Sequence, residues 1–264
     1  MIEKIYTTDY LELGNFLWLF TVLSSFIFVR YLLLSAAFHQ AFRNSLHSVL
    51  GNRDLLKVKL DREQAKKEIG YSFISSIIFA IIAVAMIIGW QHGIVKIYAE
   101  TDSAHPWWYI PISLMLILFL HDTYYYWLHR LFHVKTVYKK VHRVHHKSIK
   151  TSAFTSFSFH PFESVAQAIA IPITLLFIPI HIYAFLGMLI FMTLSAIVNH
   201  LGVEVYPSGK AGAWFGKWFI GATHHDQHHR KFLVNYGLYF TFWDRWMGTE
   251  APDFEENFKK AVEN

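Results

Sequence analysis

Long stretches without charged residues constrain this chain more than any other feature. Residues 69–90 contain no Lys, Arg, Asp or Glu, and residues 13–38 contain only Arg30. About 20 consecutive apolar residues are enough to cross the hydrocarbon core of a bilayer, and a long arginine side chain can reach the interface. We therefore predict two membrane-spanning helices in the first 90 residues.

Two further apolar regions follow. Residues 107–128 are apolar apart from His121 and Asp122, which predicts a third span. Residues 164–203 contain no Lys, Arg, Asp or Glu, and this region is long enough for two short crossing or partly crossing helices. A turn near residues 179–183 would join them, so we expect a hairpin that returns to the side from which it started.

The composition agrees with a membrane protein built as one unit. Hydrophobic residues make up 54% of the chain and charged residues 16%, whereas a soluble domain usually carries about 25% charged residues. The fold class predicted is all-α: a membrane helical bundle of about four transmembrane or partly crossing helices with a cytoplasmic helical cap. We expect a single domain over residues 1–264, in which 1–120 supply the N-terminal spans and 121–250 carry the histidine clusters and the catalytic region.

Lysine and arginine indicate the orientation of the bundle. Residues 39–68 and 129–163 each carry seven of them, residues 204–264 carry seven more, and residues 91–106 carry only Lys96. Because basic loops stay on the cytoplasmic side, we predict an outside N-terminus and a cytoplasmic face formed by the three basic segments. Topology and anionic headgroups explain the net charge of +5 without a nucleic-acid partner.

Most of the 17 histidines lie after residue 120, in clusters with helical spacing. The first cluster is a pair at positions i and i+4, and the other two are triplets at i, i+3 and i+4. The members are His129 and His133, then His142, His145 and His146, and then His225, His228 and His229. Positions i, i+3 and i+4 share one face of a helix, so we expect each cluster to point two or three imidazoles at one place.

Imidazole is a common ligand of Zn, Cu, Fe and Ni. The clusters supply more histidines than the three or four side chains that hold one catalytic zinc ion, so we predict two metal ions. The chain has no cysteine, which excludes thiolate ligands. His200 follows the predicted hairpin and is expected to reach the same place as a further ligand. The sequence leaves open whether His200, His224 or His160 completes the ligand set.

Two aspartates are candidates for supporting the ligands. Asp122 precedes His129 by seven residues, about two helical turns, and therefore lies on the same face. We expect it to accept a hydrogen bond from a ligand imidazole and so to fix the ring's tautomer; the alternative is a pairing with a buried Tyr or Arg. Asp226, inside the last cluster, is expected to play a similar supporting part.

These residues resemble the histidine boxes of the fatty acid hydroxylase and sterol desaturase superfamily. The three boxes are similar to Asp122-Thr-Tyr-Tyr-Tyr-Trp-Leu-His129-Arg130-Leu-Phe-His133, His142-Arg-Val-His145-His146 and His225-Asp226-Gln-His228-His229. Shorter elements of the family resemble His160-Pro161-Phe-Glu163, His200-Leu-Gly202, Asn235-Tyr236-Gly237, Trp243-Asp244 and Gly248-Thr249. The resemblance covers about residues 121–250, with the elements in the family's order.

The resemblance implies an integral-membrane, non-haem diiron enzyme that uses O2 and two electrons to hydroxylate, desaturate or oxidatively cleave a lipid. A sterol-like, fatty-acyl or ether-lipid substrate remains open. Some fatty acid hydroxylases have a second histidine four residues before the position of His200, where this chain has Ala196; this slightly favours a sterol or ether lipid. The implied iron ligands are His129, His133, His142, His145, His146, His225, His228 and His229, with His200 next.

The electrons are expected from a separate donor protein, cytochrome b5-like or a ferredoxin with its reductase. These 264 residues contain no HPGG haem element, no GxGxxG loop and no cysteine for an iron–sulfur cluster. The basic cytoplasmic face is expected to dock an acidic donor. The alternative function is a membrane metal-ion transporter that uses the histidine clusters as binding sites, although transport sites usually lie near the bilayer midplane.

Overall fold

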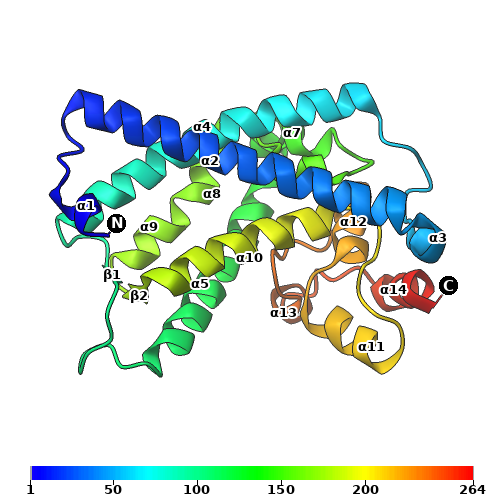
Figure 1. Ribbon diagram of the computed structural model, residues 1–264. Helices are drawn as coiled ribbons and strands as arrows, with labels where there is room; N and C mark the ends of the chain where they lie inside the picture. Colours follow the sequence, from blue (N-terminus) through cyan, green and yellow to red (C-terminus); the bar gives the residue numbers. More distant parts are fainter. Residues whose placement is uncertain (1, 264) are drawn as a thin grey trace.

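Four long helices form the body of the protein within the part that this computed structural model describes, residues 2–263 (Figure 1). The first, α2, continues into a π-helical segment, η1. Their bounds are Leu13–Phe38 for α2, His39–Ser45 for η1, Arg62–Gln91 for α4, Tyr109–Phe132 for α5 and Ile182–His200 for α10. A short helix, α1 (Ile2–Thr7), precedes them.

Acidic side chains fix the beginning of two of these helices. Asp61 accepts hydrogen bonds from the backbone N–H groups of Glu63 and Gln64 at the start of α4, and Glu12 accepts one from Gly14 at the start of α2. The first N–H groups of a helix have no partner inside the helix, so these caps stabilise the boundary. Helix α4 therefore begins in polar sequence, before its apolar run.

Helices α2 and α4 lie side by side along much of their length (Figure 1). A short 3-10 helix, η3 (Ala153–Phe157), packs against both. The Tyr31 hydroxyl donates to the carbonyl of Phe154 at 2.7 Å, and Ser35 Oγ donates to the carbonyl of Ala153 at 3.1 Å. The first span is thereby fastened to the segment that follows the second histidine cluster.

The predicted hairpin is present. Helices α8 (Pro161–Ala168) and α9 (Ala170–Leu175) run outward, and α10 returns. At the turn, strand β2 (Ile180–His181) pairs in parallel with β1 (Ile97–Tyr98), with Ile97 opposite Ile180. This pairing lies near the N-terminus and at the end of the bundle away from α12 and α14 (Figure 1).

Three helices are long and apolar enough to cross a membrane among the described residues: Leu13–Ser45, Arg62–Gln91 and Ile182–His200. Many apolar side chains of α2 are exposed, Trp18, Phe26 and Leu33 among them, as expected for a surface covered by lipid. The third predicted span does form a helix, α5, but this helix is not among the three. Its second half carries His121, Asp122, His129 and Arg130, which lower its apolar character.

A cap of short helices gathers at the other end of the bundle, where α3 and the C-terminus lie (Figure 1). The polypeptide supplies it from three regions of sequence. Its elements are α3 (His47–Leu50), η2 (Gly51–Arg53), α6 (Lys135–Lys140), α7 (Arg143–His146), α11 (Gly209–Trp218), α12 (Ala222–Lys231), α13 (Phe242–Trp246) and α14 (Phe254–Glu263). The fold is therefore the all-α membrane helical bundle with a cap that the sequence predicts.

Candidate metal centre

The structure brings the nine histidines predicted as ligands into two groups that could each hold a metal ion. Within a group, one ligand atom from each residue lies within 4.8 Å of the others. Both groups consist of imidazoles alone, without a carboxylate. Group one contains His129, His133, His142, His146 and His228, and group two contains His145, His200, His225 and His229.

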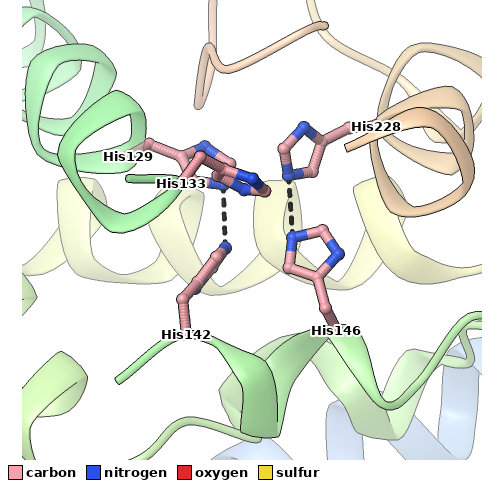
Figure 2. A group of neighbouring side chains, drawn as sticks. All are labelled: His129, His133, His142, His146 and His228. Carbon is pink, nitrogen blue, oxygen red and sulfur yellow. Dashed lines mark hydrogen bonds between the residues drawn. The ribbon is translucent and has the colours of Figure 1, made fainter. Parts of the chain in front are cut away.

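Group one is formed by three separate elements (Figure 2). His129 and His133 come from the end of α5, His142 and His146 from α7 and its N-cap, and His228 from α12. The Nε2 atoms of His129 and His142 are 3.1 Å apart, and those of His146 and His228 are 3.0 Å apart. All five rings point toward one another.

Group two lies beside group one. His200, the last residue of α10, places its Nε2 3.2 Å from that of His145 and 2.9 Å from that of His225. The Nε2 atoms of His225 and His229 are 3.1 Å apart. The rings of His146 in group one and His229 in group two have centroids separated by only 4.6 Å, so the two groups are immediate neighbours.

Each histidine triplet points two rings at one group, as the spacing predicts, and its third ring at the other group. On α7, His142 and His146 face group one and His145 faces group two. On α12 the roles are reversed, because His225 and His229 face group two and His228 faces group one. Viewed along a helix, residue i+4 is rotated by about 40° from residue i in one direction, and residue i+3 by about 60° in the opposite direction. The residues i and i+4 can therefore face one site while i+3 faces the site beside it. A helix inserted between two adjacent sites therefore serves both.

Backbone carbonyl groups orient many of these rings. The Nδ1 atoms of His129 and His228 lie 2.8 Å and 2.7 Å from the carbonyl oxygens of Tyr236 and Val234. In group two, His200 Nδ1 lies 2.7 Å from the carbonyl of Ala196, and His145 Nδ1 lies 3.3 Å from that of Ser158. A carbonyl oxygen only accepts, so each Nδ1 donates its proton and leaves a lone pair on Nε2 of the neutral ring.

This proton arrangement tests whether the residues fit a metal ion. His145 and His200 both donate from Nδ1, so neither Nε2 has a proton to share, yet these two atoms stand 3.2 Å apart. A cation between the two lone pairs makes such an approach favourable. Nitrogens bound at about 2.1 Å to one ion, at right angles, are separated by about 3.0 Å. The separations of 2.9–3.2 Å in both groups therefore fit ligands of a shared ion.

Burial keeps the cap histidines uncharged. For six of the grouped histidines on α7, its N-cap and α12, desolvation lowers the pKa well below the ordinary value near 6.5, and the charges of neighbouring imidazoles lower it further. A neutral imidazole has a nitrogen lone pair that can bind metal at neutral pH. The six are His142, His145, His146, His225, His228 and His229.

Glu163 supports His142 from the far side of its ring. Its Oε1 lies 2.8 Å from His142 Nδ1, and both side chains are completely buried. Gln167 Nε2 donates to the same oxygen at 3.1 Å. The sequence singles out Glu163 only as part of a short family element, and nothing in the local spacing predicts its partner, which lies 21 residues away.

Asp122 holds a loop instead of an imidazole. Its Oδ1 accepts hydrogen bonds from the backbone N–H groups of Tyr239 at 2.7 Å and Leu238 at 3.3 Å. The same loop is held by Asp244, which accepts from the N–H groups of Tyr236 and Gly237 at 2.8 and 2.9 Å. Because the carbonyl of Tyr236 orients His129, both aspartates reach that ligand through the backbone. Direct contact between Asp122 and a ligand ring, as the sequence predicted, is not seen among the described residues.

Three other predicted or undecided residues lie outside the two groups. Asp226 forms an ion pair with Arg230, with Arg230 Nε 3.0 Å from Oδ2, in place of a contact with an imidazole. His160 caps α8 and accepts from the N–H of Phe162. His224 is fully buried, and its Nε2 lies 3.7 Å from Asp244 Oδ2. Of the three histidines that the sequence left undecided, only His200 joins a group.

Residues 114–249 match the family described as fatty acid hydroxylase. The chain is 28% identical to a Delta(7)-sterol 5(6)-desaturase of Gibberella zeae over 74% of this chain and 58% of that protein. It is 30% identical to the lathosterol oxidase of Mus musculus over 75% of this chain and 64% of that protein.

A third relative, the Delta(7)-sterol 5(6)-desaturase of Leptosphaeria maculans, is 29% identical over 76% of this chain and 54% of its own length. The chain thus spans less than two thirds of each of these three relatives. No solved structure matches it. The matched region contains the nine grouped histidines, Glu163 and both loop-holding aspartates. The family match covers more than half of the chain, which therefore belongs to the fatty acid hydroxylase family.

Proposed function

We propose that this protein is a membrane-embedded oxidoreductase that binds two iron ions and uses O2 to hydroxylate or desaturate a lipid. The observation that carries the proposal is the pair of adjacent all-histidine groups at the end of a membrane helical bundle. The named activities of the relatives, sterol desaturases and a lathosterol oxidase, support a sterol-like substrate. They also favour an oxidoreductase over a metal transporter.

The bound irons would supply the reduction of O2 and the oxidation of the substrate C–H bond. The chain would hold them with His129, His133, His142, His146 and His228 at one site and His145, His200, His225 and His229 at the other. Carbonyl groups and Glu163 orient the rings, and burial of the ligands excludes water. Phe159 packs against His145, with ring centroids 5.1 Å apart, and gives that side of group two an apolar wall.

The orientation and the electron donor are also part of the proposal. The groups lie at the end of the bundle that carries the basic segments, so we assign them to the cytoplasmic face. A lipid would enter sideways from the bilayer, and electrons would come from a separate protein such as a cytochrome b5-like carrier or a ferredoxin. Lys139, Lys140 and Lys147 lie beside the second cluster and supply positive charge for an acidic donor.

The test is the metal content of the purified protein after reconstitution with ferrous iron. We expect about two irons per chain, and about one in the double variant His200→Ala/His225→Ala, which removes ligands of group two alone. His181→Ala, in the strand at the opposite end, is the matched control and should keep both irons. O2 uptake should then depend on added lipid, with a Δ7-sterol compared against a fatty-acyl lipid.

Two results would contradict the proposal. The first is wild-type iron content in the double variant, which would show that group two does not hold metal. The second is transport of iron or zinc into sealed proteoliposomes without lipid-dependent O2 uptake, which would favour the transporter.

A further inference from the structure

A second site candidate lies between the end of α2 and the start of α4, away from the metal centre. It is an open cavity of about 950 Å³ in the connection between these two helices. No histidine of either metal group lines it. Residues that matter for its chemistry are His39, Arg43, Asp54, Lys57, Lys59 and Arg62. We call it the α2–α4 cavity.

The α2–α4 cavity has an excess of positive charge. Arg43 is paired with Asp54, with Nη1 3.2 Å from Oδ1 and Nη2 3.2 Å from Oδ2. Lys57, Lys59 and Arg62 are exposed, and no ion pair to any of them occurs among the described residues. Three cations without a counter-ion therefore surround one neutralised aspartate. Such a concave basic surface is chemically suited to a phosphate group.

His39 adds a polar atom without a partner to this cavity. Its Nδ1 is buried and makes no hydrogen bond to the part of the chain that the structure describes. A buried polar nitrogen normally has a partner. Because this nitrogen has almost no accessible surface, a ligand in the open cavity does not reach it, and the case for an occupant rests on the cationic side chains.

The connection that lines the cavity is firmly attached to its surroundings. Asp54 Oδ1 accepts from the backbone N–H of Leu56 at 2.9 Å and of Lys57 at 3.0 Å, which holds Lys57 at a φ of 50°. The N–H of Leu55 donates to the carbonyl of Gly202, and Arg230 Nη2 donates to the carbonyl of Leu55. The cavity is therefore preformed, and its wall is bonded to α12 and to the segment just after His200.

The position of the cavity identifies the source of the phosphate. It lies where the candidate spans Leu13–Ser45 and Arg62–Gln91 meet the cap, and in the membrane orientation proposed above this junction is at the level of the lipid headgroups. Basic pockets between spans bind anionic headgroups on the cytoplasmic side. We propose that the α2–α4 cavity binds the phosphate of an anionic phospholipid through Lys57, Lys59 and Arg62. This site is separate from the metal centre and does not depend on the proposed reaction.

The experiment measures binding of short-chain phosphatidylglycerol to the full-length chain in neutral detergent, with phosphatidylcholine of the same chain length as the zwitterionic reference. The test variant is Lys57→Gln/Lys59→Gln. The matched control is Lys66→Gln/Lys67→Gln, which removes the same charge from exposed positions near the start of α4 that do not line the cavity. We expect phosphatidylglycerol to bind more tightly than phosphatidylcholine, and the test variant to lose about tenfold in affinity while the control does not.

Three outcomes would overturn the proposal. Equal phosphatidylglycerol affinity in the test variant and in the wild type would show that the cavity lysines do not bind it. Inorganic phosphate that binds as tightly as phosphatidylglycerol would identify a site for free phosphate instead. Loss of binding to an acidic electron-transfer protein, with lipid affinity unchanged, would identify a docking surface. Metal content, measured in all variants, separates these outcomes from a failure of the proposed function.

Discussion

At the scale of single residues, the two nitrogens of each histidine ring have different tasks. The nitrogen that faces away from the group holds the proton, so the nitrogen that faces the group keeps a lone pair for a metal ion. In four rings the Nδ1–H group donates a hydrogen bond to a backbone carbonyl, that of Ser158, Ala196, Val234 or Tyr236. The lone pair on Nε2 of each ring then faces the neighbouring rings. Outer partners of this kind raise the basicity of a ligand and fix its orientation. The ring of His142 has a carboxylate in this position, Glu163.

The carboxylate of Glu163 should therefore influence metal affinity without binding the metal. We expect Glu163→Ala to weaken metal binding about tenfold to a hundredfold, because His142 loses its partner. Glu163→Gln keeps an oxygen that can accept from Nδ1 and should retain more of the affinity. Competition of the apoprotein with a chelator for ferrous iron or zinc measures both.

Glu63→Gln is the control for this pair of variants, since Glu63 is exposed and forms an ion pair with Lys66. It should bind metal as the wild type does. Wild-type affinity in Glu163→Ala would contradict a supporting role for Glu163.

At the scale of elements, the short helices of the cap have to pack closely against one another because they position α12, which carries three of the grouped histidines. Helix α11 packs against α14, and Gly216 faces the ring of Phe258. At Gly212 the constraint is stronger, because an added Cβ would lie 1.7 Å from the carbonyl oxygen of Pro207. Glycine at this helical position is explained by the close approach of backbone.

Gly212→Ala should destabilise the protein although alanine favours a helix. The gain in helix propensity is about 1 kcal/mol, whereas the clash with backbone forces a shift that costs about 1–3 kcal/mol and more where the backbone is rigid. Thermal unfolding in detergent should show a lower midpoint. Gly70→Ala in α4, where a Cβ meets nothing within 4 Å, should be neutral or stabilising; an unchanged midpoint in Gly212→Ala would disprove the clash.

At the scale of the whole molecule, burial of many neutral histidines should make stability depend on pH. The folded state holds the pKa of six cap histidines well below 6.5, whereas the unfolded chain protonates them near 6.5. Below that pH the unfolded state binds more protons, so the free energy of unfolding falls as the pH decreases. Each such histidine contributes at most about 1.4 kcal/mol per pH unit.

Unfolding of the metal-free protein in detergent, measured from pH 8 to pH 5.5, should therefore show a loss of stability below about pH 6.5. The buried carboxyl groups of Glu163, Glu204 and Asp244, whose pKa values burial raises, offset part of that loss. His225→Asn should reduce the slope in the acidic range. Stability that stays constant down to pH 5.5 would contradict burial of neutral rings.

The arrangement of the helices also predicts which segments share a side of the membrane. The chain contains no cysteine, so Ser103→Cys, in the loop before α5, and Ser208→Cys, in the cap, each provide a single exposed thiol. In sealed vesicles of known sidedness, an impermeant thiol reagent should label Ser103→Cys from the outer side and Ser208→Cys only from the cytoplasmic side. Labelling of both from one side would contradict the proposed topology.

The amino-acid sequence determined the apolar helices, the hairpin and the identity of the grouped histidines. Uncharged runs predicted α2, α4 and α10 because a bilayer accepts few charges, and helical spacing marked the clusters. The sequence also predicted α5 as a membrane span. Its polar second half keeps it out of the three helices that are apolar enough to cross a membrane. The position after the predicted hairpin added His200, and the family resemblance added the C-terminal elements.

Only the tertiary structure decided how the histidines are divided. Spacing shows that His142, His145 and His146 share one side of a helix, but the division depends on α5, α10 and α12, which meet α7 from distant parts of the sequence. The carbonyl partners of the rings could not be predicted from the sequence either, since every residue has a carbonyl group and the local sequence pattern does not indicate which one accepts. The contacts of Asp122 with the loop at 238–240 arise in the same way. Long-range packing fixes most of these pairings, because they join residues that no helical period relates; the exception is His200, whose partner Ala196 lies one turn earlier in α10.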